Sequence, residues 1–165
     1  MTTDTWTEKA KGGFNTLDVS QKYIDAALKW LDVWLTDQAF SEYVPQIQYL
    51  IDSGKWNYLL DAFYQVIPFG TGGRRGLVGI GPNRINSWTI QASAQGHSQY
   101  LTKVFGEEAK KRGVVLTYDV RKYTQKGTYD DSEPNPVMEL DGSKLARAAA
   151  EVYAANHIKV FMYNE

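Results

Sequence analysis

At positions 69–86 the chain reads FGTGGRRGLVGIGPNRIN. Six of the twelve residues from Gly70 to Gly81 are glycine, which indicates backbone conformations that other residues avoid, or a close approach of the backbone to a ligand. Arginines lie among these glycines, and no acidic residue occurs between Gly70 and Asn86. Exposed amides beside guanidinium groups suit a phosphate or another oxyanion. A mobile glycine-rich surface loop is the alternative interpretation.

The stretch matches neither of the common nucleotide-binding motifs. A Walker A loop ends in Gly-Lys-Ser or Gly-Lys-Thr, which is absent here. A dinucleotide fingerprint follows a strand, whereas this stretch follows a predicted helix and Pro68. The stretch is therefore interpreted as a site for a phosphate or another oxyanion and not as a nucleotide-binding motif.

Upstream of Pro68 the pattern is helical. Apolar residues recur at intervals of four, three and four, which predicts one buried helix face: Ile24, Leu28, Leu31 and Leu35. Ser20 is the predicted N-cap of this helix, and further helices are expected at about 40–51 and 57–66. Residues 1–19 are polar and are predicted to be a leader, disordered in part. Residues 20–67 then form a helical N-terminal extension.

Downstream, residues 68–165 are predicted to form an incomplete α/β domain. A helix is expected over 87–112, capped by Asn86 or Ser87 and ended by Gly113. The β-branched run at 114–118 predicts a strand buried on both faces. A polar loop at 123–141, a helix at 143–156 and a second strand at 158–163 follow. The order strand, helix, strand predicts a right-handed parallel crossover, so the fold class is α/β.

A second cationic segment, Tyr118-Asp119-Val120-Arg121, follows the first predicted strand. Ligands gather beyond the carboxyl ends of strands in parallel sheets, and Asp119 could orient Arg121 towards such a ligand. A surface ion pair without function is the alternative. His97 lies on an apolar helix stripe and is interpreted as a packing residue. The acidic residues of 130–141 are interpreted as a solvated loop and not as a metal site.

Composition limits the possible partners. The 165 residues carry a net charge of -1 and no cysteine. These values give no basic field for nucleic acid and no thiolate metal site. No apolar run of 18 residues occurs, and residues 1–11 lack the core of a secretory signal. We therefore expect a cytoplasmic protein with no nucleic-acid or membrane partner.

Three ordered motifs resemble those of the α-D-phosphohexomutase family. FGTGGRRG at 69–76 with GIGPNRIN at 79–86 resembles the opening signature of the family. Tyr118-Asp119-Val120-Arg121 resembles the next motif, and AANHIKVF at 154–161 is similar to the crossover that the family writes Ala-Ala-Asn-Gly-Ile-Lys-Val. The helical lead-in is most like that of the longer phosphoglucomutase and phosphopentomutase branch. The match begins at about residue 25.

The resemblance implies the N-terminal part of domain I of a phosphoglucomutase-type enzyme. Such an enzyme moves a phosphoryl group between the 1- and 6-hydroxyls of a hexose through a phosphoserine, with Mg²⁺ and a hexose 1,6-bisphosphate intermediate. The resemblance places Thr71, Arg75 and Arg121 near that phosphoserine. Together with the residue-based interpretation, the predicted sugar-phosphate site is Thr71, Gly72, Gly73, Arg75, Arg84, Asn86 and Arg121.

The sequence also departs from the family pattern, and these departures bear on the predicted activity. The catalytic Thr-Ala-Ser-His-Asn-Pro loop, the aspartate-rich metal loop and the sugar-selecting loop do not occur in the 165 residues. We therefore expect the catalytic serine and the metal ligands beyond this chain, an excised or truncated piece that is inactive alone and binds no cofactor. Arg74 and His157 replace a usual leucine and glycine.

Several alternatives stay open. The parent enzyme could be a phosphopentomutase or a phosphomannomutase, since the loop that selects the sugar is missing. The chain could also be a non-catalytic module that binds sugar phosphates at its present length. Finally, an incomplete sheet leaves an open edge and an apolar face, so self-association is a further possibility.

Overall fold

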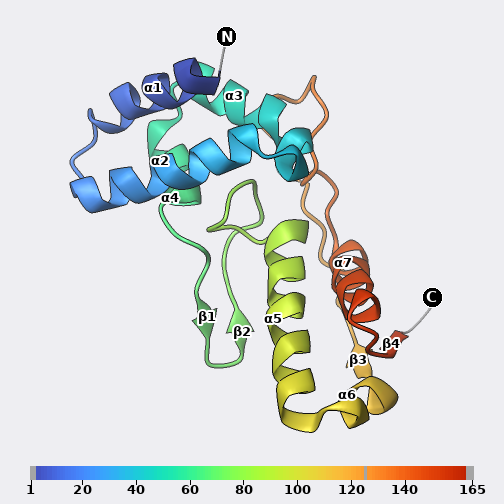
Figure 1. Ribbon diagram of the computed structural model, residues 1–165. Coiled ribbons are helices and arrows are strands. Elements are labelled where there is room, and N and C mark those ends of the chain that lie inside the picture. Colours follow the sequence, from blue (N-terminus) through green and yellow to red (C-terminus); the bar gives the residue numbers. More distant parts are fainter. Residues whose placement is uncertain (1–2, 125, 163–165) are drawn as a thin grey trace. The chain divides into compact units, whose positions relative to one another are not determined.

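A computed structural model describes residues 3–124 and 126–162 (Figure 1). The chain forms two compact units, each made of two stretches of sequence. Unit 1 contains the chain up to Ile85 together with Thr124–Met138. Unit 2 contains Asn86–Tyr123 and the chain from Glu139 onward. The glycine-rich stretch up to Ile85 belongs to unit 1 together with the helices that precede it. The domain boundary at residue 68 stays a prediction.

The described residues of unit 1 form four α-helices and one 3₁₀-helix: α1 (Thr3–Phe14), α2 (Gln21–Thr36), η1 (Gln38–Tyr43), α3 (Val44–Asp52) and α4 (Trp56–Phe63). Three of the four residues of the predicted stripe of α2 are buried, Ile24, Leu31 and Leu35, and the fourth, Leu28, is partly buried. Trp34 of the same helix is fully buried and stacks on Phe40, with ring centroids 4.3 Å apart. These apolar contacts form the core of the unit.

The first residues differ from the predicted leader. Helix α1 buries Trp6, Ala10 and Phe14, which recur every four residues along one face. Phe14 meets the ring of Trp56 edge to face at 6.4 Å.

The glycine-rich stretch and a distant loop complete unit 1. Strands β1 (Phe69–Gly70) and β2 (Gly73–Arg74) pair antiparallel, which makes a hairpin. The segment 124–138 has no helix or strand among its described residues, as the loop prediction required. It is held by the buried Gln46, whose amide group donates to Asp130 O at 3.0 Å and accepts from Asp130 N at 2.9 Å.

Up to residue 162, unit 2 contains three helices and a parallel strand pair: α5 (Ser87–Phe105), α6 (Glu107–Arg112), β3 (Val114–Leu116), α7 (Gly142–Ala155) and β4 (Val160–Met162). The single helix predicted over 87–112 is broken at Gly106, which has φ +57. Gly113 ends α6 with φ +74, as predicted. His157 follows α7 at φ +60, a conformation that costs a non-glycine residue energy.

The parallel crossover is confirmed. Val114 pairs with Val160 and Leu116 with Met162 in a parallel register, and α7 connects the two strands. The prediction that the first strand is buried on both faces is wrong, because Val115 is 68% exposed. Val114 and Leu116 pack against a cluster that includes Tyr153 and Ile158, whereas alternation turns Val115 to the opposite face.

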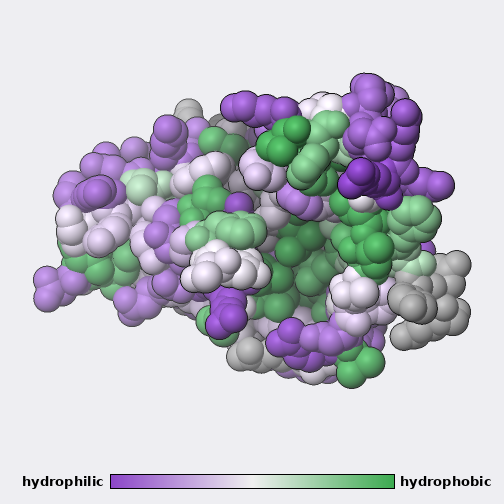
Figure 2. All heavy atoms as spheres, turned by 90° about the horizontal axis from the view of Figure 1, so that it is seen from below, coloured by the Kyte–Doolittle hydropathy of each residue, from purple (hydrophilic) through white to green (hydrophobic). Residues whose placement is uncertain are grey.

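Hydrophobic side chains are also visible on the surface. Figure 2 shows them gathered in patches among hydrophilic residues. Large exposed apolar residues occur in both units and include Phe69, Leu77, Val115 and Val120. In the described parts of the chain, no helix combines the length and the apolar character needed to cross a membrane.

Candidate functional site

The hairpin formed by β1 and β2 brings four of the predicted site residues together. Phe69 pairs with Arg74 and Gly70 with Gly73, so Thr71 and Gly72 form the tip. Gly73 has φ +136, a conformation that side chains rarely permit. The glycine at this position is therefore required by the turn.

A cavity of about 300 Å³ opens at this hairpin. It is lined by Pro68, Gly70, Thr71, Gly72, Gly73 and Arg75. The lining residues carry one hydroxyl group, on Thr71, and one guanidinium group, on Arg75, and none of them carries a carboxylate. These are donors without a competing negative charge, which is the chemistry of an oxyanion site.

The two adjacent arginines of the hairpin serve different faces. Arg74 lies beside its cross-strand partner Phe69, and its Nη1 donates to Ile67 O at 2.8 Å. Arg75 lines the cavity and is exposed. Within residues 3–124 and 126–162, Arg75 has no hydrogen bond or ion pair to another side chain or to the backbone. Its guanidinium is available to an anion.

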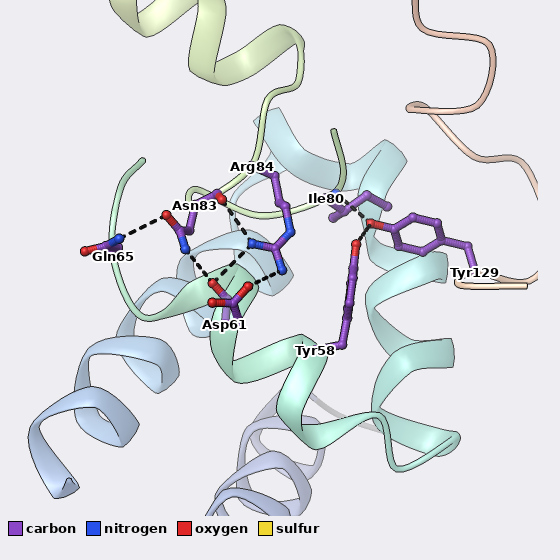
Figure 3. A network of polar contacts seen from close by, with 7 residues as sticks. All are labelled: Tyr58, Asp61, Gln65, Ile80, Asn83, Arg84 and Tyr129. Atoms are coloured by element: carbon purple, nitrogen blue, oxygen red, sulfur yellow. Dashed lines mark hydrogen bonds and ion pairs between the residues drawn. The ribbon is translucent and has the colours of Figure 1, made fainter. Parts of the chain in front are cut away.

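Arg84 was predicted to contact phosphate, but its side chain is held inside unit 1 (Figure 3). It is 3% exposed, and its Nη2 lies 2.6 Å from Asp61 Oδ2. Its guanidinium also lies 5.0 Å from the ring centre of Tyr58. Burial opposes the charge, but the hydrogen bonds and charges of Asp61 and Tyr58 raise the pKa of Arg84 on balance. The Arg84 cation is thus stabilised by the protein, and it does not line the cavity.

The same network fastens the segment 79–84 to α4 and to Tyr129 of the segment 124–138 (Figure 3). Asn83 Nδ2 donates to Asp61 O at 2.8 Å, and Ile80 N donates to Tyr129 Oη at 2.7 Å. Gly81 approaches α4 so closely that a Cβ atom would lie 2.5 Å from Ala62 O. Gly81 is therefore required for the close packing of this segment against α4. Sequence reasoning missed this network because its members lie about twenty or more residues apart.

Asn86, another predicted phosphate contact, begins unit 2 as the N-cap of α5. Its Oδ1 accepts from Thr89 N at 3.0 Å, and Thr89 Oγ1 accepts from Asn86 N at 3.0 Å. The residue is fully buried. The prediction that Asn86 or Ser87 caps this helix is confirmed, and the local spacing made it visible in the sequence.

Arg121 lies in unit 2, a few residues beyond the end of β3. The predicted pairing with Asp119 is found: Arg121 Nε and Nη2 lie 2.7 Å and 2.6 Å from Asp119 Oδ2. Hydrogen bonds from Arg121 lower the pKa of Asp119, so the carboxylate stays charged. The Arg121 side chain is 89% exposed. Whether Arg75 and Arg121 meet at one ligand stays a prediction.

Neither histidines nor carboxylates form a metal site in the described part of the chain, where no three His, Cys, Asp or Glu residues gather. His97 Nδ1 lies 2.8 Å from Tyr153 Oη, and this contact joins α5 to α7.

Comparison with known proteins finds relatives of one kind. The chain is 31% identical to a phosphopentomutase of Mus musculus over 137 residues, which are 83% of this chain and 19% of that protein. It is 32% identical to a glucose 1,6-bisphosphate synthase of Mus musculus over 119 residues, 72% of this chain and 17% of that protein. A phosphoglucomutase of Staphylococcus haemolyticus (strain JCSC1435) is 36% identical over 70 residues, 42% of this chain and 12% of that protein.

The chain thus spans less than a fifth of the length of these relatives. No protein-family model matches it. No solved structure matches it either.

Proposed function

Because the chain is homologous over most of its length to members of the α-D-phosphohexomutase family, we propose that its hairpin binds the phosphate of a sugar phosphate. In this proposal the chain is part of a phosphoglucomutase-type intramolecular phosphotransferase, which interconverts hexose 1-phosphate and hexose 6-phosphate. The observation that supports it most directly is the cavity at the hairpin, where Arg75 is exposed and unpaired beside Thr71 and three glycines.

The contribution of these residues is binding and electrostatic neutralisation. Arg75 would hold a phosphoryl oxygen with charge-assisted hydrogen bonds, while Thr71 and the backbone amides donate to the other oxygens. Fixing the phosphate and offsetting its charge are the main protein contributions in phosphoryl transfer. The phosphoserine and the Mg²⁺ ligands of the resembled family are absent from the 165 residues. We propose that they, and the hexose 1,6-bisphosphate intermediate, belong to a larger enzyme.

A pentose phosphate is the second candidate substrate. The phosphopentomutase relative matches 83% of the chain, whereas the bacterial phosphoglucomutase relative matches 42%. Both substrates present a phosphate group, so the hairpin suits either. Reading the gene on both sides of the 165 codons would test this choice, because the sugar-selecting loop is encoded there if the proposal is correct.

Titration of the 165-residue chain with inorganic phosphate, followed by amide NMR, tests the hairpin. We expect shifts at Thr71, Gly72 and Gly73, and we expect Arg75→Ala to weaken binding at least about 10-fold, through loss of a charge-assisted contact. Arg147→Ala, at an exposed position on α7, removes the same charge and serves as the control. Equal affinities of Arg75→Ala and wild type would remove Arg75 from the site.

The same preparation tests whether the chain acts alone. Incubated with glucose 1-phosphate, glucose 1,6-bisphosphate and Mg²⁺, it should form no glucose 6-phosphate, because the resembled nucleophile is missing. Turnover would refute this expectation. Micromolar binding of glucose phosphates without turnover would instead favour a non-catalytic sugar-phosphate-binding module.

A further inference from the structure

The hairpin is too short to hold its shape by strand pairing alone. Strands β1 and β2 contain two residues each and share two register pairs. Even longer two-stranded hairpins are marginally stable in water. A site at the tip of this hairpin therefore needs another contact that fixes its orientation.

Arg74 provides such a contact. Its Nη1 donates to Ile67 O at 2.8 Å, seven residues back and just before β1 begins. Its Nε is buried and has no hydrogen-bond partner within residues 3–124 and 126–162. This burial lowers the pKa of Arg74 from its ordinary value. The side chain is thus folded back onto the base of the hairpin.

The acceptor of this bond is itself firmly held. Ile67 is 3% exposed, and its backbone N donates to Pro82 O at 2.8 Å. The chain just after β2 passes close by, because a Cβ atom on Gly76 would lie 2.6 Å from Ile67 Cδ1. Arg74 therefore links the hairpin to a point that is fixed in unit 1.

The position of Arg74 in the hairpin bears on the orientation of its neighbour Arg75. Arg74 lies on the same face as its pairing partner Phe69. The next residue, Arg75, follows the end of β2 and lines the cavity together with Gly70 and Gly73, whereas Arg74 does not line it. If the hairpin rotated or frayed, Arg75 and the glycine amides would no longer face one cavity.

We infer that Arg74 is a positioning residue, whose hydrogen bond to Ile67 O keeps Arg75 and the amides of Gly72 and Gly73 directed at one phosphate. The inference rests on the proposed function of the hairpin. It assigns to the two neighbouring arginines different tasks, orientation for Arg74 and ligand contact for Arg75. The relevant property of Arg74 is its donor group and not its charge.

Two substitutions separate these properties. Arg74→Gln removes the charge but keeps a side-chain N–H donor on a shorter side chain, whereas Arg74→Leu removes both. We expect Arg74→Leu to weaken binding of inorganic phosphate about 5- to 10-fold and Arg74→Gln to stay within about 2-fold of wild type. Amide hydrogen exchange at 69–74 should accelerate in Arg74→Leu alone, while exchange in α2 and α4 stays unchanged.

The outcomes distinguish the inference from the proposal beneath it. If Arg74→Gln loses as much affinity as Arg74→Leu, Arg74 acts through its charge and the inference is overturned. Wild-type affinity in Arg74→Leu overturns it as well. If the wild-type chain does not bind phosphate, the proposed function fails and the inferred role in binding fails with it. Hydrogen exchange at 69–74 would then still report whether Arg74 orders the hairpin.

Discussion

Tyr43 shows how burial at a single residue links stability to pH. It is 4% exposed, and its ring centre lies 5.0 Å from that of Trp34. Desolvation, with a smaller effect from the charge of Glu42, raises the pKa of Tyr43 to about 12 from 10.0. Because the folded-state pKa is the higher one, this group stabilises the fold fully below pH 10. That contribution is lost as the pH rises from 10 towards 12.

We therefore expect the free energy of unfolding to fall more steeply above pH 10 in wild type than in Tyr43→Phe. The difference should approach about 2 kcal/mol near pH 12, since each unit of pKa shift corresponds to about 1.4 kcal/mol. Urea unfolding at pH 8, 10 and 11.5 measures it. A constant difference between the two proteins over this range would contradict the prediction.

The sequence predicted the role of a polar residue only where its partner lies a few residues away along the chain. Asn86 was predicted as a helix cap because Thr89 is three residues away, and the pairing of Arg121 with Asp119 is equally short-range. Arg84 looked like Arg75, since both lie among glycines. Its partner Asp61 lies 23 residues earlier, on a helix whose exposed face gave no sign of an ion pair. The contact of Arg74 with Ile67 O depends on the geometry of the hairpin, which the glycine-rich sequence did not predict.

At the scale of elements, the largest difference from the sequence prediction is α1, a helix where a partly disordered leader was expected. Two neighbouring glycines in it have opposite surroundings. A Cβ atom on Gly12 would meet nothing within 4 Å, whereas one on Gly13 would lie 2.2 Å from the ring of Trp56. This contrast makes a matched pair of substitutions that reports on the docking of the helix.

Gly12→Ala should stabilise the chain by up to about 1 kcal/mol, because alanine favours a helix over glycine. Gly13→Ala should destabilise it by about 1–3 kcal/mol, because the added methyl group overpacks the contact with α4. Urea midpoints at pH 7 measure both changes. Equal small effects at the two positions would instead support a disordered leader.

The strand prediction failed for a reason that no local pattern reveals. Val114, Val115 and Leu116 are all apolar, so the run indicates burial on both faces. Only one face of the strand pair packs against the cluster of α5 and α7. Val115 and its register partner Phe161 are 68% and 46% exposed on the other face. Sequence patterns show which residues prefer burial, but they do not show what is present to cover them.

At the scale of the whole molecule, the chain crosses repeatedly between its two units. It passes from unit 1 to unit 2 after Ile85, returns after Tyr123 and leaves again after Met138. Arg75 lies ten residues before the first crossing, and Arg121 two residues before the second. Both cationic segments are therefore close in sequence to points where the units join. That the two arginines share a ligand stays a prediction.

A double-mutant cycle tests this prediction. Arg75→Ala, Arg121→Ala and the double variant are titrated with inorganic phosphate at fixed ionic strength. If both guanidinium groups contact one phosphate, each single substitution weakens binding. The double variant should then depart from additivity by at least about 0.5 kcal/mol, because the ligand left by one arginine can shift relative to the other. Asp119→Asn, which removes the charge that pairs with Arg121, should weaken binding through the same arginine. Additive effects, or no effect of Arg121→Ala, would place Arg121 outside the phosphate site while leaving the hairpin assignment intact.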